Sequence, residues 1–319
     1  MYIVGVDLGG TQLRAALSDA SGRIYRRLAE PTKAVEGVEA VLSRLKDLLR
    51  QTMAGVPPTE IEAIGISAPG PLDPRAGVIL TAPNLPGWNE VPLRHIIAAE
   101  FGYPTYLGND ANLAALAEGR FGAGRGLKDF IYITVSTGIG GGVITDGRLL
   151  LGERGLGAEV GHMTLEANGP RCNCGNIGCL EALASGTAIA REATLRLSEG
   201  RSSLISDMVQ GDLSRVTGQT VYEAAQKGDP LAHEVFARAG FYLGVGIVNL
   251  LYLFNPTRII LGGSVMKAGD LILNPVWEVV RRRISRFYWE RLSIVLADLG
   301  DDVGLLGAVA LVLDAKGQD

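Results

Sequence analysis

The amino-acid sequence predicts an α/β protein of two lobes in which one supersecondary unit occurs twice. The chain has 319 residues, which exceeds the length at which a single hydrophobic core usually stops growing. Apolar runs of strand length alternate with segments of helical periodicity. A strand, a glycine turn and a second strand occur around residue 9 and again around residue 138. A repeat of this kind indicates a duplicated fold.

The first lobe is expected to comprise residues 1–110 together with residues from about 300 to 319, and the second lobe residues 111–299. Three strands separated only by turns begin the chain, which predicts an antiparallel meander. The elements expected in the first lobe are strands at 2–7, 13–19 and 23–28, a helix over 37–53, a strand at 61–67, a helix over 92–100 and a strand that ends at residue 108.

The second lobe repeats the opening plan from residue 129, with a strand, a glycine-rich turn and a second strand. A long apolar helix over 231–254 carries three glycines. Each costs about 1 kcal/mol relative to alanine, so we expect close helix packing there. The other elements expected are helices over 186–199, 221–227 and 275–288, strands at 258–265 and 292–297, and a helix over 303–314 that returns to the first lobe.

Composition and charge are those of an ordinary globular protein. Hydrophobic residues make up 47% of the chain and charged residues 20%, a usual balance. The net charge of −4 argues against a broad nucleic-acid-binding surface. No basic signal-peptide segment precedes the first strand, and no apolar run of membrane-span length is expected. A cytoplasmic location without membrane or nucleic-acid partners is therefore predicted.

All three cysteines lie within residues 159–181, in the spacing H-x9-C-x-C-x4-C. The four candidate ligands are His162, Cys172, Cys174 and Cys179. Three thiolates and one imidazole form a complete tetrahedral set for a structural Zn²⁺. The alternatives are three buried free cysteines, or a disulfide with one odd thiol, which a reducing compartment does not favour.

Two carboxylates flank this stretch. Glu159 and Glu181 are not needed to complete the zinc shell, so we expect the metal to hold a loop that presents them to a ligand. His162 is expected to use one ring nitrogen for the metal and the other towards the substrate. The alternative is that both glutamates are solvated surface residues.

The first glycine turn is a candidate phosphate site. Asp7 ends the first strand, and Gly9, Gly10 and Thr11 follow it. Backbone amides without bulky side chains can surround a phosphate, although an ordinary hairpin turn would give the same pattern. The second turn, with Ser136, Thr137, Gly138 and Gly140, repeats it, and a third glycine turn occurs at 262–264.

Two further segments carry candidate ligand-binding residues. Asn84 lies in an ordered loop and can both donate to and accept from a hydroxyl, whereas Trp88 in the same loop is expected to pack in the core. Asp110 follows a strand and Asn109 and opens a helix, where its charge is favoured. A plain N-cap is the alternative interpretation of Asp110.

The combined motifs resemble the ROK family of bacterial sugar kinases and repressors, over almost the whole chain, and within it the glucokinase branch. The motifs that carry the resemblance are D-L-G-G-T (7–11), A-P-N-L-P-G-W (82–88), G-N-D-A-N (108–112), S-T-G-I-G-G-G (136–142), E-V-G-H (159–162), C-N-C-G-N-I-G-C-L-E (172–181), L-E-A-L-A-S-G-T-A (180–188) and L-G-G-S (261–264).

The resemblance implies a two-lobed, actin-like, ribonuclease-H-like duplicated fold with ATP and a hexose in the interdomain cleft. It implies that Asp110 is the catalytic base. The chemistry of phosphoryl transfer separately predicts Mg²⁺ with the ATP, and Asp7 is the candidate water-mediated partner of that metal. The remaining implied contacts are Asn84, Asn109, Asp110, Glu159, His162 and Glu181 for the sugar, residues 9–11 and 137–140 for phosphate, and Gly263 for adenosine.

These observations predict ATP-dependent phosphorylation of a hexose at the 6-hydroxyl, most simply glucose, by a homodimer or homotetramer. N-acetylmannosamine, N-acetylglucosamine and fructose are alternative acceptors. Gln12 stands where many family members have Lys, and Arg14 is a candidate substitute. A repressor would be expected to carry a DNA-binding segment before residue 3, and a non-catalytic sugar sensor would be expected to lack Asp110 or the first glycine turn.

Overall fold

The computed structural model describes residues 1–317, which form two compact units. Residues 318 and 319 of the expected first lobe lie outside the described residues. Unit 1 comprises Met1–Lys128, Gly142–Ala158 and the C-terminal part of the chain from Ala297, and unit 2 comprises Asp129–Gly141 and Glu159–Leu296.

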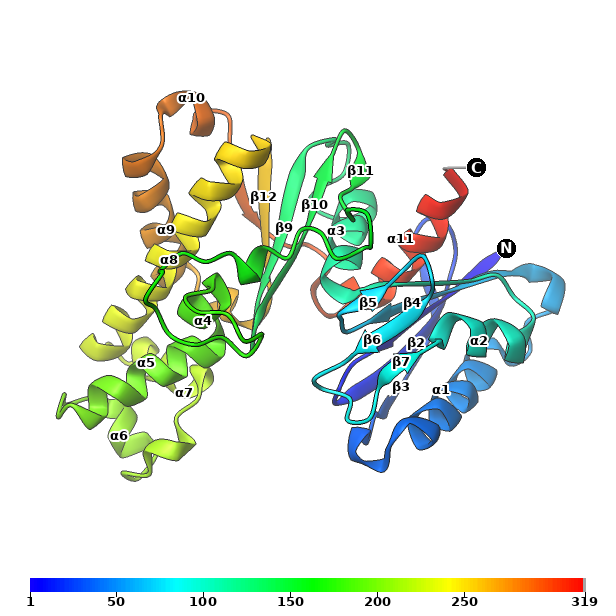
Figure 1. Cartoon of the computed structure of the whole chain (residues 1–319), viewed down its shortest axis with the longest axis horizontal. Coiled ribbons are helices and arrows are strands. Elements are labelled where there is room, and N and C mark those ends of the chain that lie inside the picture. Colours follow the sequence, from blue (N-terminus) through cyan, green and yellow to red (C-terminus); the bar gives the residue numbers. More distant parts are fainter. Residues whose placement is uncertain (318–319) are drawn as a thin grey trace. The chain divides into compact units, whose positions relative to one another are not determined.

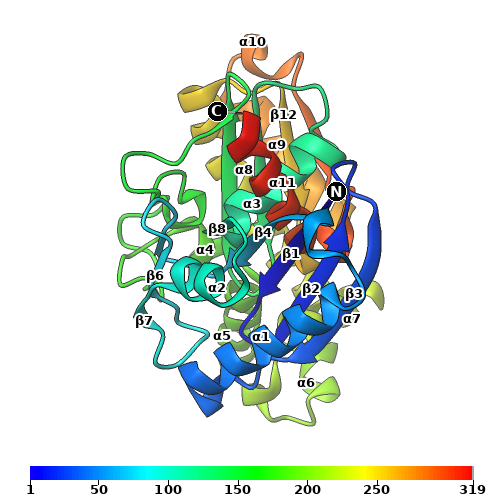
Figure 2. The same cartoon turned by 90° about the vertical axis from the view of Figure 1, so that its right-hand side faces the viewer.

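Unit 1 is built on a five-stranded sheet of order β3-β2-β1-β4-β8. Its strands are β1 (Tyr2–Leu8), β2 (Gln12–Ser18), β3 (Ile24–Pro31), β4 (Ile61–Ala68) and β8 (Thr105–Asn109). The pairs β1–β2 and β2–β3 are antiparallel, which confirms the expected meander, whereas β4 is parallel to both β1 and β8. Figure 2 shows β1, β2 and β3 side by side, with α1 (Val38–Met53) packed across them.

The two faces of this sheet bury different helices, because successive side chains of a strand point in opposite directions. Val4 and Val6 of β1 belong to a core cluster shared with α1 and α2 (Leu93–Phe101). Ile3 belongs to a second cluster with Val309 of α11 (Val303–Gly317). Figure 1 shows α1 and α2 on one face of the sheet and α11 on the other.

Helix α11 approaches the sheet very closely at a glycine. A Cβ atom on Gly65 of β4 would lie 2.0 Å from the carbonyl oxygen of Ala308, so no larger residue fits between strand and helix. On its other side α11 packs against α3 (Asp110–Phe121). This confirms that the terminal helix returns to the N-terminal sheet.

A small second sheet in unit 1 was not expected from the sequence. It consists of β5 (Leu72–Asp73), β6 (Val78–Thr81) and β7 (Asn89–Val91). These strands are very short, so they give little periodic signal. The loop between β6 and β7 carries Asn84, and Trp88 in the same loop is 1% exposed, as expected of a packing residue.

The second five-stranded sheet repeats the order of the first. Its order is β11-β10-β9-β12-β13, which matches β3-β2-β1-β4-β8 position for position. Strands β12 and β9 are parallel, as are β12 and β13. The predicted duplication is therefore confirmed. The strands are β9 (Phe130–Val135), β10 (Ile139–Thr145), β11 (Arg148–Leu149), β12 (Arg258–Gly262) and β13 (Ser293–Leu296), and the boundary between the units falls within β10.

Unit 2 also contains seven helices, which pack mainly on one another. They are α4 (Leu180–Ala184), α5 (Gly186–Ser198), α6 (Leu204–Met208), α7 (Gly218–Gln226), α8 (Pro230–Phe254), α9 (Asp270–Arg283) and α10 (Arg286–Trp289). The glycines of α8 allow close packing on α9: a Cβ on Gly244 would lie 2.8 Å from the Val279 Cβ. This confirms the close helix packing expected from the sequence.

Two expectations for these helices were wrong: the bounds of the helix expected over 275–288, and the absence of an apolar run of membrane-span length. The helix expected over 275–288 starts earlier, at Asp270, with Pro275 inside it, and breaks after Arg283. Pro275 lies in the second turn, where it has no N–H group to donate to the preceding turn. By length and composition α8 could also span a membrane, but 61% of its apolar window is buried inside the protein.

The observed division places more of the chain in unit 1 than the sequence expectation did. Helix α3 and residues 142–158 belong to unit 1. The physical reason is the extensive packing of α3 on α11, which ties residues just after Asp110 to the C-terminal helix.

A buried carboxylate fixes the chain segment that leads into α11. Glu118 of α3 is 0% exposed. Its carboxylate accepts the backbone N–H groups of Ala123 at 2.7 Å, Asp298 at 3.1 Å and Leu299 at 3.1 Å. A carboxylate can accept several such bonds at once, so one side chain connects α3 to the residues before α11.

We predict that Glu118→Ala lowers the free energy of unfolding by about 3 kcal/mol, because three partly buried backbone N–H groups lose their acceptor. Glu39→Ala, at an exposed position of α1, is the control and should change it by less than about 0.5 kcal/mol. Urea unfolding of both variants measures the difference. Equal midpoints for the two variants would contradict the role assigned to Glu118.

Candidate functional site

The four predicted metal ligands come together in unit 2. The ligand atoms of His162, Cys172, Cys174 and Cys179 all lie within 4.8 Å of one another. The Cys172 Sγ atom is 3.8 Å from the His162 Nδ1 atom, and the Cys174 and Cys179 Sγ atoms are also 3.8 Å apart. Tetrahedral zinc with Zn–S bonds of about 2.3 Å places its sulfurs about 3.8 Å apart. The donor set and its spacing therefore fit one Zn²⁺.

The protonation of the cluster also bears on metal binding. All three cysteines are free, so the disulfide alternative is wrong. Burial raises the pKa of the Cys172 thiol to about 12. The surrounding protein thus favours the neutral thiol, and a bound cation would have to stabilise the thiolate that metal coordination requires.

The loop between η3 (Val160–His162) and α4 is shaped by backbone bonds and glycines. The Cys172 N–H donates to the Asn176 carbonyl oxygen at 2.8 Å, and the Gly178 N–H donates to the Pro170 carbonyl oxygen at 2.8 Å. Gly178 has a φ of 67°, and a Cβ there would lie 1.7 Å from the Glu166 carbonyl oxygen. Only glycine meets both conditions.

The two predicted carboxylates lie near the metal cluster. Burial raises the pKa of Glu159 above its ordinary value; the His162 ring opposes this shift and Glu181 adds to it. Glu181 is the second residue of α4 and follows Leu180, and Cys179 is the residue before the helix. Glu181 is half-buried, so its interpretation as a solvated surface residue is wrong, whereas Glu159 has an exposed position.

The second glycine turn, Ser136–Thr137–Gly138, is held by the segment that contains α4 and the start of α5. The Gly186 N–H donates to the Ser136 carbonyl oxygen at 2.8 Å. The Thr187 hydroxyl donates to the Thr137 carbonyl oxygen at 2.8 Å. The Glu181 carboxylate accepts the Ile139 N–H at 2.9 Å. The predicted phosphate turn is thus connected directly to residues that follow the cysteine cluster.

A cavity of about 450 Å³ begins at this turn and lies wholly within unit 2. Gly263, which has a φ of 92°, precedes the Ser264 and Val265 that line the cavity. The other lining residues are Ser136, Thr137, Gly186, Thr187, Ile189, Ala190, Val216, Thr217, Gly218, Gln219, Tyr222, Phe236 and Ala268. Most of these lining residues were not predicted from the sequence. Residues 200–220 have no clear periodicity, and the cavity forms only where α5, α7 and α8 meet.

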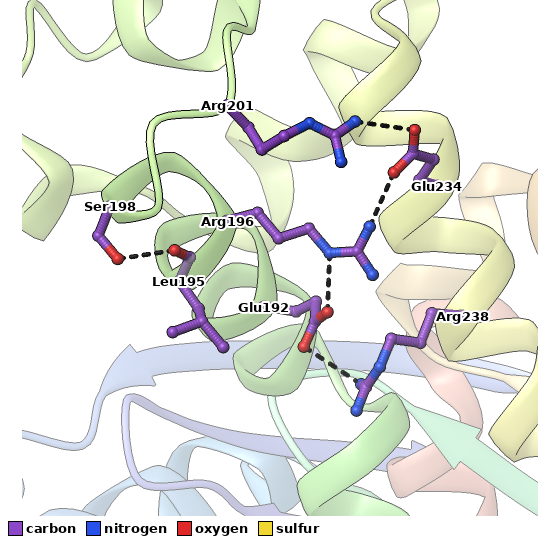
Figure 3. Close-up of polar contacts among 7 residues, drawn as sticks. All are labelled: Glu192, Leu195, Arg196, Ser198, Arg201, Glu234 and Arg238. Atoms are coloured by element: carbon purple, nitrogen blue, oxygen red, sulfur yellow. Dashed lines mark hydrogen bonds and ion pairs between the residues drawn. The ribbon is translucent and has the colours of Figure 1, made fainter.

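An ion-pair network fixes α5 against α8 beside this cavity (Figure 3). Arg196 of α5 pairs with Glu192 at 2.8 Å and with Glu234 of α8 at 2.8 Å, and Arg238 of α8 pairs with Glu192 at 3.4 Å. Arg201 adds a further bond to Glu234 at 2.9 Å. Single exposed pairs contribute little, but this chain of pairs orients the helix that carries Thr187.

The first glycine turn lies in unit 1 with two other predicted residues. The Gly9 N–H donates to the Gln12 carbonyl oxygen at 3.0 Å. A Cβ on Gly10 would lie 2.7 Å from the Asn84 Cβ atom, so Gly10 and Asn84 are in close contact. Arg14 donates to the Asp7 carboxylate and to the Asp301 carbonyl oxygen. The guanidinium of Arg14 is therefore engaged by Asp7 and by the segment before α11.

Asp7 and Asp110 lie at the same edge of the first sheet. Asp7 of β1 is in register with Ser67 of β4, which is in register with Gly108 of β8. Strands in a sheet are about 4.8 Å apart, so the carboxyl ends of β1 and β8 are about 10 Å apart. Ligands of α/β sheets collect at such edges.

Asp110 is the first residue of α3, and the cap of that helix is its neighbour. The Asn109 Oδ1 atom accepts the N–H groups of Ala111 at 3.1 Å and Asn112 at 3.2 Å. The Asp110 carboxylate accepts the Ala111 N–H at 2.7 Å. The interpretation of Asp110 as a plain N-cap is therefore wrong, because Asn109 fills that role.

Each unit of this duplicated α/β fold thus carries a glycine turn and carboxylate side chains near it. Comparison with known proteins identifies the family of proteins that has this arrangement. The model of the ROK family matches residues 3–315. The chain therefore belongs to the ROK family.

Three relatives illustrate the similarity. A glucokinase of Thermotoga maritima is 36% identical over 99% of both chains. The crystal structure of a ROK hexokinase from Thermus thermophilus has a TM-score of 0.84 at 41% identity and covers 99% of this chain and 100% of its own. A ROK glucokinase from Streptomyces griseus in complex with glucose and AMPPNP has a TM-score of 0.82 at 35% identity, over 98% of this chain and 99% of its own. Xylose repressors are also among the relatives. The expected two-lobed, actin-like α/β fold is confirmed.

We predict that Gly178→Ala disrupts the cysteine loop far more than Gly175→Ala. Both glycines have positive φ values, of 67° and 93°, but an added Cβ has no neighbour within 4 Å at Gly175. Gly175→Ala should cost about 1 kcal/mol through its backbone conformation alone. Gly178→Ala must also displace the Glu166 carbonyl group.

Thermal unfolding and the rate of thiol modification by a chromogenic disulfide reagent measure this difference. Gly178→Ala should expose the buried Cys172 and Cys179 thiols, whereas Gly175→Ala should leave these two protected. Equal protection in both variants would show that the close approach of residue 178 does not shape the loop.

Proposed function

We propose that this chain is an ATP-dependent sugar kinase that transfers the γ-phosphoryl group of ATP to the 6-hydroxyl of glucose. The glucokinases and the hexokinase among its relatives support this assignment. The structural observation that carries it is the arrangement in unit 2, where the Glu181 carboxylate contacts a glycine turn that borders a nucleotide-sized cavity.

The cavity next to the second glycine turn suits an adenosine group. Its lining combines apolar side chains, such as Val216 and Phe236, with hydroxyls and an amide, as is usual for small-molecule sites. Gly263 would allow close backbone approach at its edge. We assign Thr137, Gly138 and Gly140, whose turn borders this cavity, to the triphosphate. The backbone amides of Gly9, Gly10 and Thr11 are also assigned to phosphate.

Mg²⁺ bound with the nucleotide would neutralise charge on the phosphates. Asp7 is a candidate to hold this ion through water, because its carboxylate lies at the carboxyl edge of the first sheet. Arg14 already donates to that carboxylate, so we assign Arg14 the task of orienting Asp7. No phosphate contact is assigned to Gln12.

Sugar hydroxyls would be bound by polar side chains. We assign Asn84, Asn109, Asp110, Glu159, His162 and Glu181 to this task. Carboxylates accept hydrogen bonds from hydroxyl groups. A site built from such groups rejects analogues that lack the hydroxyl. Two residues have part of their capacity already used: the Asn109 oxygen caps α3, which leaves its amide group as a donor, and one Glu181 oxygen accepts the Ile139 N–H.

Asp110 is assigned as the general base. Its carboxylate would accept the proton of the attacking 6-hydroxyl while the bond from oxygen to phosphorus forms and the bond to the ADP oxygen breaks. Phosphoryl transfer depends mostly on positioning and charge neutralisation, so a base at a fixed helix start serves this reaction well. The first turn of α3 also favours the carboxylate form.

Zinc is proposed as a structural cofactor of the cysteine cluster. His162, Cys172, Cys174 and Cys179 would hold it, and its binding energy would stabilise the fold of the loop that leads to Glu181. We also propose a cytoplasmic homodimer or homotetramer that acts in sugar metabolism without nucleic-acid or membrane partners. N-acetylmannosamine, N-acetylglucosamine and fructose stay as alternative acceptors, and a non-catalytic sugar sensor is the remote alternative.

Glucose is predicted to be the best acceptor in a coupled assay of ADP release. The value of kcat/KM for glucose should exceed the values for fructose, mannose, N-acetylglucosamine and N-acetylmannosamine. The product should be identified as the 6-phosphate by NMR. A higher value for another sugar would overturn the glucose assignment, and no ADP release with any sugar would overturn the kinase assignment.

Asp110→Asn is predicted to lower kcat by about 10²- to 10⁴-fold, which is the usual effect of losing a general base. The affinity for glucose should change much less, because the amide can still hydrogen-bond the hydroxyl. Steady-state kinetics and a glucose titration by tryptophan fluorescence measure the two effects. A kcat within about threefold of the parent would exclude Asp110 as the base, and Glu159 would be the next candidate.

Each purified chain is predicted to contain about one zinc ion. Cys174→Ser should lose both the metal and thermal stability, because a missing thiolate removes binding energy that stabilises the fold. Elemental analysis and thermal unfolding test this, with Ser198→Ala as a control that leaves the cluster intact. Active protein without zinc would refute the assignment.

A further inference from the structure

Glu181 has contacts on two sides. Its Oε2 atom accepts the Ile139 N–H at 2.9 Å, and its Oε1 atom lies 3.5 Å from the Cys172 Sγ atom. The carboxylate therefore lies between the cysteine cluster and the start of β10, which directly follows the second glycine turn. A residue that only bound sugar would need no contact with that turn.

The second glycine turn is held by contacts inside and outside the turn. Within the turn, the described bond is from the Ser136 N–H to the Gly138 carbonyl oxygen, at 2.9 Å. From outside, Glu181, Gly186 and Thr187 contact its backbone, and the Ser264 hydroxyl lies 3.0 Å from the Ser136 hydroxyl. Of these, Glu181 holds the backbone N–H that follows Gly138.

The packing at Gly138 shows how closely the turn fits against this side chain. A Cβ atom on Gly138 would lie 2.3 Å from the Glu181 Oε2 atom, so the carboxylate fills the space beside the turn. If the side chain were shorter, the turn could relax into that space and the amides of Thr137 and Gly138 would lose their fixed direction. A phosphate bound by such amides depends on that direction.

We propose that Glu181 is a positioning residue for nucleotide binding: its reach, and not its charge, holds the second glycine turn in the conformation that receives phosphate. This inference rests on the proposed kinase function and deepens it. Glu181, which is already assigned to sugar binding, would then also support nucleotide binding. The loss of nucleotide affinity on shortening Glu181 should therefore persist when no sugar is present.

Two conservative variants separate reach from charge. Glu181→Gln keeps the length and can still present an oxygen to the Ile139 N–H, but it loses the charge. Glu181→Asp keeps the charge but is one methylene shorter, so its oxygens withdraw from that N–H. If reach is what matters, Gln should rescue nucleotide binding and Asp should not.

The experiment measures the dissociation constant of Mg·AMPPNP by calorimetry in the absence of sugar. Loss of a hydrogen bond to a charged acceptor corresponds to about a tenfold change in affinity. We therefore expect Glu181→Asp to weaken AMPPNP binding about tenfold and Glu181→Gln to stay within about threefold of the parent. In kinetics, the KM for ATP should rise in Glu181→Asp alone, whereas the KM for sugar should rise in both variants.

Glu159→Ala is the matched control. This residue is also assigned to the sugar, but among the described residues it makes no hydrogen bond to the second turn. It should raise the KM for sugar and leave AMPPNP binding unchanged. Thermal unfolding and zinc content, measured for all variants, show whether the fold is kept.

Three results would overturn the inference. The first is AMPPNP binding by Glu181→Asp equal to that of the parent. The second is equal weakening of AMPPNP binding in Glu181→Gln and Glu181→Asp, which would show that side-chain length alone does not hold the turn. The third is loss of AMPPNP binding in Glu159→Ala as well. A parent protein that binds no AMPPNP would instead overturn the proposed function together with this inference.

Discussion

The loop between η3 and α4 depends on the cluster of His162, Cys172, Cys174 and Cys179 for its shape. Few apolar side chains support this segment: the small buried group around it consists of Cys172, Cys179 and Ala182. A segment without its own core must be ordered by other forces, because fixing each backbone residue costs about 1–2 kcal/mol. Here they are the close approach of residue 178 to Glu166 and the four side chains that fit one metal ion.

In unit 1, contacts between residues far apart in the sequence order the segment that carries Asp7. Its sheet buries one face against α11, which comes from the other end of the chain. The close contact at Gly65 and the bonds of Glu118 to the residues before α11 fix this helix in place. The orientation of the Asp7 side chain depends on this placement, because Arg14 donates both to the Asp7 carboxylate and to the Asp301 carbonyl oxygen before α11. The position of a residue at the start of the chain thus depends on residues near its end.

The features that the sequence predicted well are those with a local signal. Glycine turns, the spacing of histidine and cysteines, and the strand–helix junction at Asp110 each occupy a few consecutive residues. Pattern and chemistry alone therefore indicate them, and the repeated sheet order follows from two such turns. The strands of the β5–β7 sheet are too short to show a period. Proline is favoured at the start of a helix, so the sequence predicts a helix from Pro275, whereas α9 begins at Asp270.

The residues that sequence reasoning missed act through partners far along the chain. Glu118 looks like an ordinary helix glutamate, and only the structure shows the backbone of 298 and 299 against its carboxylate. The cavity lining behaves in the same way, because α5, α7, α8 and the turn at 136–138 contribute to it from separate segments. Burial of a polar group is understood only when its partner is known, and the partner is a property of the fold.

The duplicated fold gives both glycine turns the same kind of neighbour. In unit 1 Gly10 is in close contact with Asn84, and in unit 2 Gly138 is in close contact with Glu181. Each turn proposed for phosphate therefore packs against a side chain proposed for sugar, with no room for a Cβ between them. A change of sugar preference made at Asn84 or Glu181 would disturb phosphate binding in the same unit. Glu159 makes no such contact among the described residues, so it is the position where sugar recognition can change with the least effect on the nucleotide.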